Sequence, residues 1–168
     1  MSTRFEHRAT FSAPAVAVYS ALVDRAYLEE RLQDLGGKGA ALVEHITSGD
    51  EVHLRLRQGV AAERLPGAVR SLLKGDLIVE REERWRADGA GFAAVGKATI
   101  DGVPGEIHSR TRLADRPDGD SEQVTTAEVR VGIPLVGGKL ESVIAQHVGK
   151  LMAAESEFTG KWLARHGS

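Results

Sequence analysis

The chain contains no cysteine, few aromatic residues and almost no excess of charge of either sign. The absence of cysteine excludes disulfide bonds, thiolate catalysis and cysteine-ligated metal centres. Aromatic residues make up only 5% of the 168 residues, so the core has few large side chains with which to fill space. A net charge of −2 argues against a nucleic-acid-binding protein, which usually carries a strongly basic surface.

Long apolar runs and known catalytic motifs are also missing. No stretch approaches the roughly 18 consecutive apolar residues of a transmembrane helix, and the first residues lack the apolar core of a signal peptide. We therefore expect a cytoplasmic protein without integral membrane association. The sequence has no His-Glu-x-x-His motif, no Gly-x-Ser-x-Gly motif and no Walker A phosphate loop. Its six histidines are scattered, so we expect no metal site and no cofactor.

A long amphipathic helix near the C-terminus is the clearest positive signal. It follows a glycine-containing hinge at residues 131–138 and continues to His166 without a proline. A helix of roughly 28 residues is about 42 Å long, and a partner surface of that size must come from a sheet. Apolar side chains recur along it at helical spacing, namely Leu140, Val143, Ile144, Val148, Leu151, Met152, Phe158 and Trp162.

The preceding residues alternate between apolar and polar side chains, which is typical of strands. The first strand is expected at 3–11. Two short helices follow, one entered through the cap-type Ser12 and Pro14 and one at 25–35. A loop with one helical turn is expected at 61–74, because Leu65-Pro66-Gly67 interrupts the alternation. The remaining strands are expected at 40–47, around 52–57, and at 77–87, 91–100, 105–113 and 123–133.

This order of elements resembles the START/Bet v 1-like superfamily, also called SRPBCC. The resemblance depends most on residues 5–15, where a strand runs through a cap and a proline into a helix, and on Ile133-Pro134 before the final helix. Two further segments look like an uncharacterised bacterial branch, namely Leu65-Pro66-Gly67-Ala68-Val69 and Glu82-Glu83-Arg84-Trp85.

The resemblance implies an α+β helix-grip fold in a single domain spanning residues 1–168. A seven-stranded antiparallel sheet would wrap around the long C-terminal helix, with two short helices between the first and second strands. Members of the superfamily are similar in having a cavity between sheet and helix, which commonly holds a lipid, a polyketide, a sterol or another hydrophobic small molecule.

Small side chains give a physical reason for a cavity that does not depend on the resemblance. Ser109 and Thr111 place hydroxyl groups on the presumed inner face of one strand. Interiors pack to a density of about 0.75, so faces with small residues imply either close backbone approach or unfilled space. The inner face of the strand at 91–100 carries Phe92, Ala94, Gly96, Ala98 and Ile100, and three of these five are very small.

Three ionisable residues lie where an apolar surface is expected. His147 and Glu155 interrupt the apolar stripe of the terminal helix about two turns apart, and His7 shares a strand face with Phe5 and Phe11. Apolar surroundings shift the pKa of a carboxylate or imidazole, which is one condition for acid–base catalysis. We favour the alternatives, which are a hydrogen-bonded core histidine and a glutamate paired with a basic residue at the rim of the sheet.

Arg81, Glu83 and Trp85 share one face of a strand with Leu77 and Val79. If they point inward, they form a polar anchor inside an apolar pocket. The alternative, which the sequence favours, is a strand that leaves the core at Arg81, with a solvated charge run. The candidate ligand-binding residues are His7, Arg81, Glu83, Trp85, Phe92, Ser109, Thr111, His147, Leu151 and Glu155.

These features support three hypotheses about function. The first is a non-catalytic binding protein or carrier for a hydrophobic small molecule, lipid-like or polyketide-like. The second is an enzyme of the cyclase/dehydratase or hydrolase type found in the superfamily, with His7, His147 or Glu155 as acid or base. The third is an interaction module that acts through its surface or as a dimer, with a core too well filled for a ligand. We expect a monomer or a homodimer. A second subunit could pack on the small residues on the other side of the terminal helix, although such residues are more often simply tolerated; they are Ser142, Ala145, Gly149, Ala153, Ser156 and Gly160.

Overall fold

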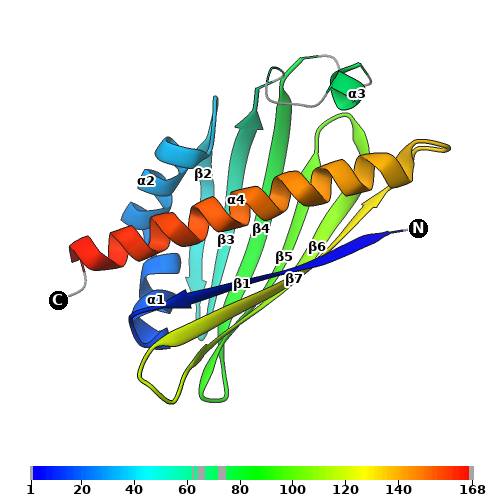
Figure 1. Cartoon of the computed structure of the whole chain (residues 1–168). Helices are drawn as coiled ribbons and strands as arrows, with labels where there is room; N and C mark the ends of the chain where they lie inside the picture. The colour runs from blue at the N-terminus through cyan, green and yellow to red at the C-terminus, as the bar shows by residue number, and fades with distance from the viewer. Residues whose placement is uncertain (1, 62, 64–66, 72–74, 167–168) are drawn as a thin grey trace.

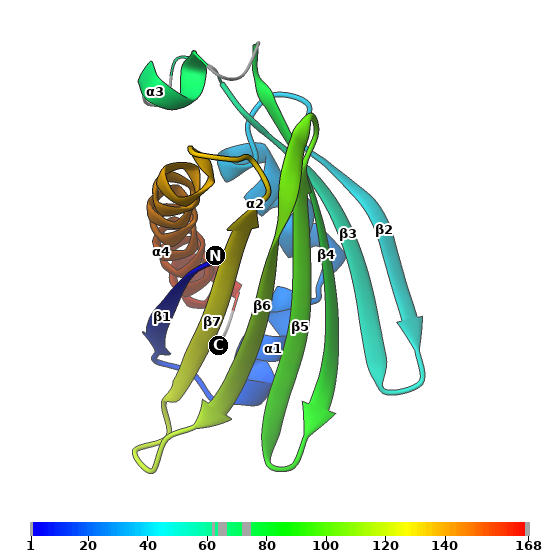
Figure 2. The ribbon, with the colours of Figure 1, turned by 90° about the vertical axis from the view of Figure 1, so that its right-hand side faces the viewer.

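A seven-stranded antiparallel sheet curves around one long helix in the computed structural model, which describes residues 2–61, 63, 67–71 and 75–166 (Figures 1 and 2). The α+β helix-grip fold expected from the sequence is therefore confirmed. The elements are β1 (Thr3–Phe11), α1 (Ala15–Leu22), α2 (Arg25–Leu35), β2 (Ala41–Ser48), β3 (Glu51–Val60), α3 (Gly67–Arg70), β4 (Leu77–Asp88), β5 (Gly91–Ile100), β6 (Val103–Asp115), β7 (Ser121–Val131) and α4 (Gly137–His166).

The strand order β1-β7-β6-β5-β4-β3-β2 places the first two strands at opposite edges of the sheet. β1 pairs with β7, from Thr3 opposite Val129 to Phe11 opposite Ser121, whereas β2 to β7 form successive antiparallel pairs. The chain crosses from one edge to the other through α1 and α2, and α4 lies across the concave face (Figure 1). The space between this face and α4 is where the core forms.

The starts of the helices differ in part from the sequence predictions. Ser12 is not the cap of α1; Pro14 occupies that position, and the Ala15 N–H donates to the carboxylate of Asp115 at 2.7 Å. A residue 100 positions away thus supplies the cap, which local sequence could not reveal. α2 has the expected bounds, and Asp24 caps it by accepting from the Tyr27 N–H at 3.0 Å.

The hinge before α4 is also shorter than expected. Gly137 and Gly138 belong to the helix, and the turn lies in the residues before them, where Leu135 has a positive φ of 72°. The buried Glu141 then joins the start of α4 to the sheet, because its carboxylate accepts from the Val131 N–H at 2.9 Å.

The loop predicted at 61–74 lies partly outside the described residues, as do Leu65 and Pro66, on which its prediction depended. Within the described part, α3 is the single helical turn expected there. No helix among the described residues is long and apolar enough to cross a bilayer.

Charged side chains cover the convex face of the sheet and pair across strands. Examples are Arg4 with Glu128 at 2.6 Å and Arg57 with Glu80 at 2.9 Å. Such exposed pairs each stabilise the fold by about 1 kcal/mol or less. Most apolar side chains therefore pack between the concave face and the helices, although a few on the outer face, such as Val95, are exposed.

Apolar residues on the concave side form two clusters. The aromatic cluster, around α1, α2 and the C-terminal part of α4, contains seven of the eight aromatic residues, namely Phe11, Tyr19, Tyr27, Trp85, Phe92, Phe158 and Trp162. The aliphatic cluster, around β6, β7 and the N-terminal part of α4, has as its buried members Leu77, Val103, Ile107, Ala127, Val129, Val131, Leu140 and Ala145. The two ends of α4 thus pack against side chains of very different size.

Candidate functional site

A cavity of about 630 Å³ lies between the sheet and α4. This volume falls within the range of about 300 to 1,000 Å³ that is usual for small-molecule sites. Several of its exposed wall residues, namely Asp34, Lys38 and Lys150, lie near the C-terminal end of α2 and on α4. Much of the wall is aliphatic and comes from β4, β6 and α4, with Val79, Ile107, Val143, Ile144, Val148 and Leu151 among its members.

Small residues on β5 and β6 contribute to the cavity in two ways. Gly96 and Ser109 are register partners that approach closely, so a Cβ added to Gly96 would collide with the Ser109 hydroxyl group. Ala98, two residues further along β5, lies in the cavity wall and leaves space in front of it. Small inner-face residues were expected to give either close approach of neighbouring strands or unfilled space, and β5 shows both.

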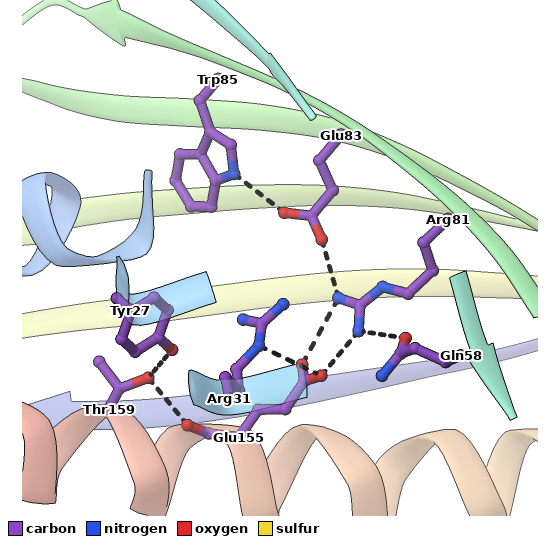
Figure 3. Close-up of polar contacts among 8 residues, drawn as sticks. All are labelled: Tyr27, Arg31, Gln58, Arg81, Glu83, Trp85, Glu155 and Thr159. Atoms are coloured by element: carbon purple, nitrogen blue, oxygen red, sulfur yellow. Dashed lines mark hydrogen bonds and ion pairs between the residues drawn. The ribbon is translucent and has the colours of Figure 1, made fainter. Parts of the chain in front are cut away.

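A group of charged and polar side chains forms part of the cavity wall (Figure 3). We call Arg31, Gln58, Arg81, Glu83 and Glu155 the polar cluster; all of them except Arg31 line the cavity. Arg81 of β4 is at its centre and donates to Glu155 of α4 at 2.7 Å, to Glu83 at 2.8 Å and to Gln58 of β3 at 3.0 Å. The cluster thus connects the middle of the sheet to the terminal helix.

The aromatic cluster supports the polar cluster from the side away from the cavity. The Trp85 indole donates to the second carboxylate oxygen of Glu83 at 2.9 Å. The Thr159 hydroxyl donates to the backbone carbonyl of Glu155 at 2.8 Å and so accepts the hydrogen bond from the Tyr27 hydroxyl at 2.6 Å (Figure 3). These contacts hold the carboxylate of Glu83 and the backbone of Glu155 in fixed positions.

Arg31 of α2 adds a second buried guanidinium to the cluster. It is only 5% exposed, its Nε is 3.8 Å from Glu155, and its guanidinium carbon is 5.5 Å from the centre of the Tyr27 ring. Among the described residues its Nε and Nη2 have no hydrogen-bond acceptor. Because a guanidinium has five N–H donors, the cluster has more donors than its neighbouring acceptors use.

The charges of the cluster keep Glu155 ionised. Burial alone raises the pKa of this carboxyl, but the positive charges of Arg31 and Arg81 and hydrogen bonds from Arg81 and Gln58 outweigh burial and lower the pKa below its ordinary value. Burial lowers the pKa of Arg81, but the negative charges of Glu155 and Glu83 raise it by more, so the pKa lies above its ordinary value. Both partners are therefore charged at neutral pH.

Six of the ten candidate residues from the sequence lie in the cavity wall. They are Arg81, Glu83, Ser109, His147, Leu151 and Glu155. The expectation that a solvated surface begins at Arg81 is wrong. The strand keeps its alternation beyond Arg81, and among residues 81–86 only Arg84 and Arg86 are exposed. Glu155 has a basic partner, as the sequence suggested, but this partner is Arg81 on an interior strand and not a residue at the rim of the sheet.

The structure places the other four candidates outside the cavity wall. The ring of His7 contacts the Ser156 hydroxyl at 3.2 Å, because β1 at the edge of the sheet runs beside α4. Phe92 stacks on Tyr19 with centroids 4.1 Å apart, and Trp85 packs against the same Tyr19 ring, so both fill the aromatic cluster. Thr111 pairs with Thr125 across β6 and β7 at 2.9 Å.

Arg31 and Gln58 are the cluster members that sequence reasoning missed. Gln58 follows Val52, Leu54 and Leu56 at every second position, which indicates an inner-face residue. Arg31 follows Tyr27 at helical i,i+4 spacing on the buried side of α2, where an arginine indicates a buried ion pair. The alternation along β3 and the helical spacing along α2 could therefore have identified both residues from the sequence.

The small residues on the other side of α4 are not all free for a second subunit. Ala145 is buried in the aliphatic cluster, and Ser156 contacts His7 of β1. Part of this side therefore packs within the chain itself.

Comparison with known proteins gives a family, a sequence relative and several similar structures. A family model described as "Protein of unknown function (DUF2505)" matches residues 6–163. Uncharacterized protein Rv0481c of Mycobacterium tuberculosis is 28% identical over 174 aligned residues, covering 99% of each chain.

Two solved structures illustrate the shared fold. A START superfamily protein from Mycobacterium smegmatis has a TM-score of 0.62 at 13% identity, covering 95% of this chain and 98% of its own. The Zhui aromatase/cyclase from Streptomyces sp. R1128 has a TM-score of 0.61 at 18% identity, covering 100% of both chains. At such low identities the likeness concerns the fold, and the START/Bet v 1-like resemblance found in the sequence is confirmed at that level.

Proposed function

We propose that this chain, which belongs to the DUF2505 family of unknown function, binds a hydrophobic small molecule in the cavity between the sheet and α4. The observation that supports this proposal is a cavity of about 630 Å³ with a largely aliphatic wall and one polar cluster. Burial of ligand surface there would contribute about 25 cal/mol per Å² of apolar area. A lipid-like or polyketide-like molecule suits such a wall, with the polar cluster setting its orientation.

An enzymatic role of the cyclase/dehydratase or hydrolase type is the alternative, because one protein with this fold is an aromatase/cyclase. It requires two ionisable side chains within reach of one position in the cavity. His147 and Glu155 are separated by about 12 Å along α4, and His7 contacts Ser156 instead. Glu155, ionised and held by Arg81, is a poor proton donor at neutral pH. This arrangement favours binding without chemistry.

A surface interaction module is the third hypothesis, and it assumes a core that is too well filled for a ligand. The size of the cavity speaks against that assumption. Cytoplasmic location, a monomeric or dimeric state and a single domain over residues 1–168 stay predictions from the sequence.

Native mass spectrometry of the protein purified from its own host tests the proposal. We expect a mass adduct that disappears on denaturation and that extraction identifies as a hydrophobic molecule. A homogeneous mass of the protein alone, together with no binding across a panel of lipids, would refute the binding function.

A matched pair of variants places the ligand. Ala98→Trp fills the cavity from β5, and we expect it to weaken binding by about tenfold or more, because the ligand and the indole would compete for the same space. Val95→Trp changes the same strand on its outer face, where Val95 is 52% exposed, and should leave binding unchanged. Equal effects of the two variants would show that the ligand lies elsewhere.

A further inference from the structure

We propose that the cavity selects uncharged ligands with an oxygen acceptor, such as an alcohol or an ester, over carboxylates and amines of the same chain length. This inference rests on the proposed function and adds the chemical class of the ligand's polar group. Its basis is the balanced charge of the polar cluster and the unpaired hydrogen-bond donors of the neighbouring wall.

The polar cluster is already neutral within itself. Arg81 lies 2.8 Å from Glu83 and 2.7 Å from Glu155, and the second guanidinium, of Arg31, lies 3.8 Å from Glu155. Two positive charges thus face two negative charges. All four side chains are buried to at least about four fifths of their surface, so water screens their fields weakly.

A charged ligand group would find no unpaired counter-ion within the polar cluster. A carboxylate would lie beside Glu83 and Glu155 while Arg81 is already paired with both. An ammonium group would lie beside Arg81 and would compete with it for the same carboxylates. Burial of an ion without a partner costs several kcal/mol, whichever its sign.

The wall nevertheless offers hydrogen bonds to an uncharged oxygen. The Ser109 hydroxyl and the His147 ring line the cavity, and neither has a hydrogen bond to another described residue. Arg31 lies behind Glu155 and does not line the cavity, so its two unpaired nitrogens are not available to a ligand there. The donors that a ligand can reach are the Ser109 hydroxyl and the His147 ring. An unsatisfied buried donor costs about 1 to 3 kcal/mol, so a ligand oxygen that accepts from either group is favoured over a bare hydrocarbon end.

Other charged residues at the cavity lie where solvent reaches them. Lys38, Lys97 and Lys150 border the cavity, and all three are exposed. Salt and water screen exposed charges within about 10 Å. These three lysines therefore offset the cost of a buried ligand charge only slightly.

Four probes that share a tetradecyl-length chain test the selectivity: tetradecanol, methyl tetradecanoate, tetradecanoate and tetradecylamine. Their affinities are measured by displacement of the uncharged dye Nile red at neutral pH. We expect the alcohol and the ester to bind about tenfold or more tightly than either ion. Tetradecanoate or tetradecylamine binding as tightly as the alcohol would overturn the inference while leaving hydrophobic binding intact. Failure of all four probes to bind would instead refute the proposed function, and the inference with it.

A change of charge in the cluster should reverse the preference. Glu155→Gln leaves one positive charge in excess, so the ratio of tetradecanoate to tetradecanol affinity should rise by about tenfold. The control is Glu157→Gln, two residues away on the exposed side of α4, where Glu157 pairs with Lys161 at 3.1 Å. An unchanged ratio in a folded Glu155→Gln protein contradicts the inference, and if that variant does not fold, the four-probe panel on the native protein decides.

Discussion

The two ends of the space between the sheet and α4 are filled in different ways. At the C-terminal end of α4, rings pack against rings, as Tyr27 does against Trp162 with centroids 5.5 Å apart. Toward the N-terminal end, aliphatic side chains surround a cavity of about 630 Å³. The same helix and the same sheet border both regions, but α1 and α2 add their side chains to the filled end, so these helices and the large rings together make that end solid.

The polar cluster lies between these two regions and depends on both. Trp85 and Tyr27 of the aromatic cluster hold Glu83 and, through Thr159, the backbone of Glu155. Arg81, Glu83 and Glu155 border the cavity on the other side. A well-packed region that fixes the polar groups of an adjacent open region is the arrangement that ligand recognition requires. Substitutions at the filled end, in the polar cluster and at the hollow end should therefore differ in how much stability they remove.

The largest loss of stability is expected from the filled end. Trp162→Ala should lower the free energy of unfolding by about 4 kcal/mol, because the indole is 7% exposed and packs against Tyr27 in a region without room to collapse. Urea unfolding followed by circular dichroism measures this loss. A loss below about 1 kcal/mol would mean that the aromatic cluster is not the stable part of the molecule.

A slightly smaller loss is expected from the polar cluster. Arg81→Met leaves the buried Glu155 with Arg31 as its remaining cation at 3.8 Å and should cost about 3 kcal/mol in unfolding free energy. Arg84→Met is the matched control on the same strand, because Arg84 is exposed and its substitution should change stability by about 0.5 kcal/mol or less. Similar effects of the two substitutions would contradict an inward role for Arg81.

The ionisation of Glu155 should make stability depend on acid pH. Its pKa is lower in the folded protein than the ordinary value of 4.5, so its contribution to stability is fully present above about pH 4.5 and is lost as pH falls through the folded pKa. Glu155→Gln should remove this part of the dependence. We therefore expect the difference in unfolding free energy between native protein and variant to shrink from pH 6 to pH 3. A constant difference would show that Glu155 has the same pKa in both states.

The smallest effect is expected at the hollow end. Leu151→Ala removes a half-buried side chain of the cavity wall and should cost about 1 kcal/mol or less, because part of its surface faces the cavity instead of other atoms. Its urea unfolding midpoint should lie well above that of Trp162→Ala. If the two variants lose equal stability, the two ends do not differ in packing.

The success of the sequence predictions differed between fold and site for a physical reason. Alternation along β4 and β5 and the stripe on α4 are local patterns, so the positions of the strands in the sequence, the length of the helix and most of the inward faces followed from them. The arrangement of the sheet around α4 was implied by the superfamily resemblance. The inward direction of Arg81 was judged wrongly, because the choice between a solvated run and a buried ion pair depends on whether Glu155, 74 residues later, lies opposite. His7 and Phe92 also have inward phase, but the edge position of β1 and the packing of Tyr19 determine what they contact.

The sequence by itself determined the order of helices and strands, the scarcity of large side chains and the inner positions of small ones, because periodicity and composition do not depend on distant neighbours. The resemblance of that order to the START/Bet v 1-like superfamily implied the helix-grip architecture. Only the tertiary structure decided where the few aromatic residues gather, which charges pair across α2, β4 and α4, and hence which end of the terminal helix faces a cavity. These outcomes depend on contacts between residues far apart in the chain, and packing volume and buried charge are settled only when such contacts are known.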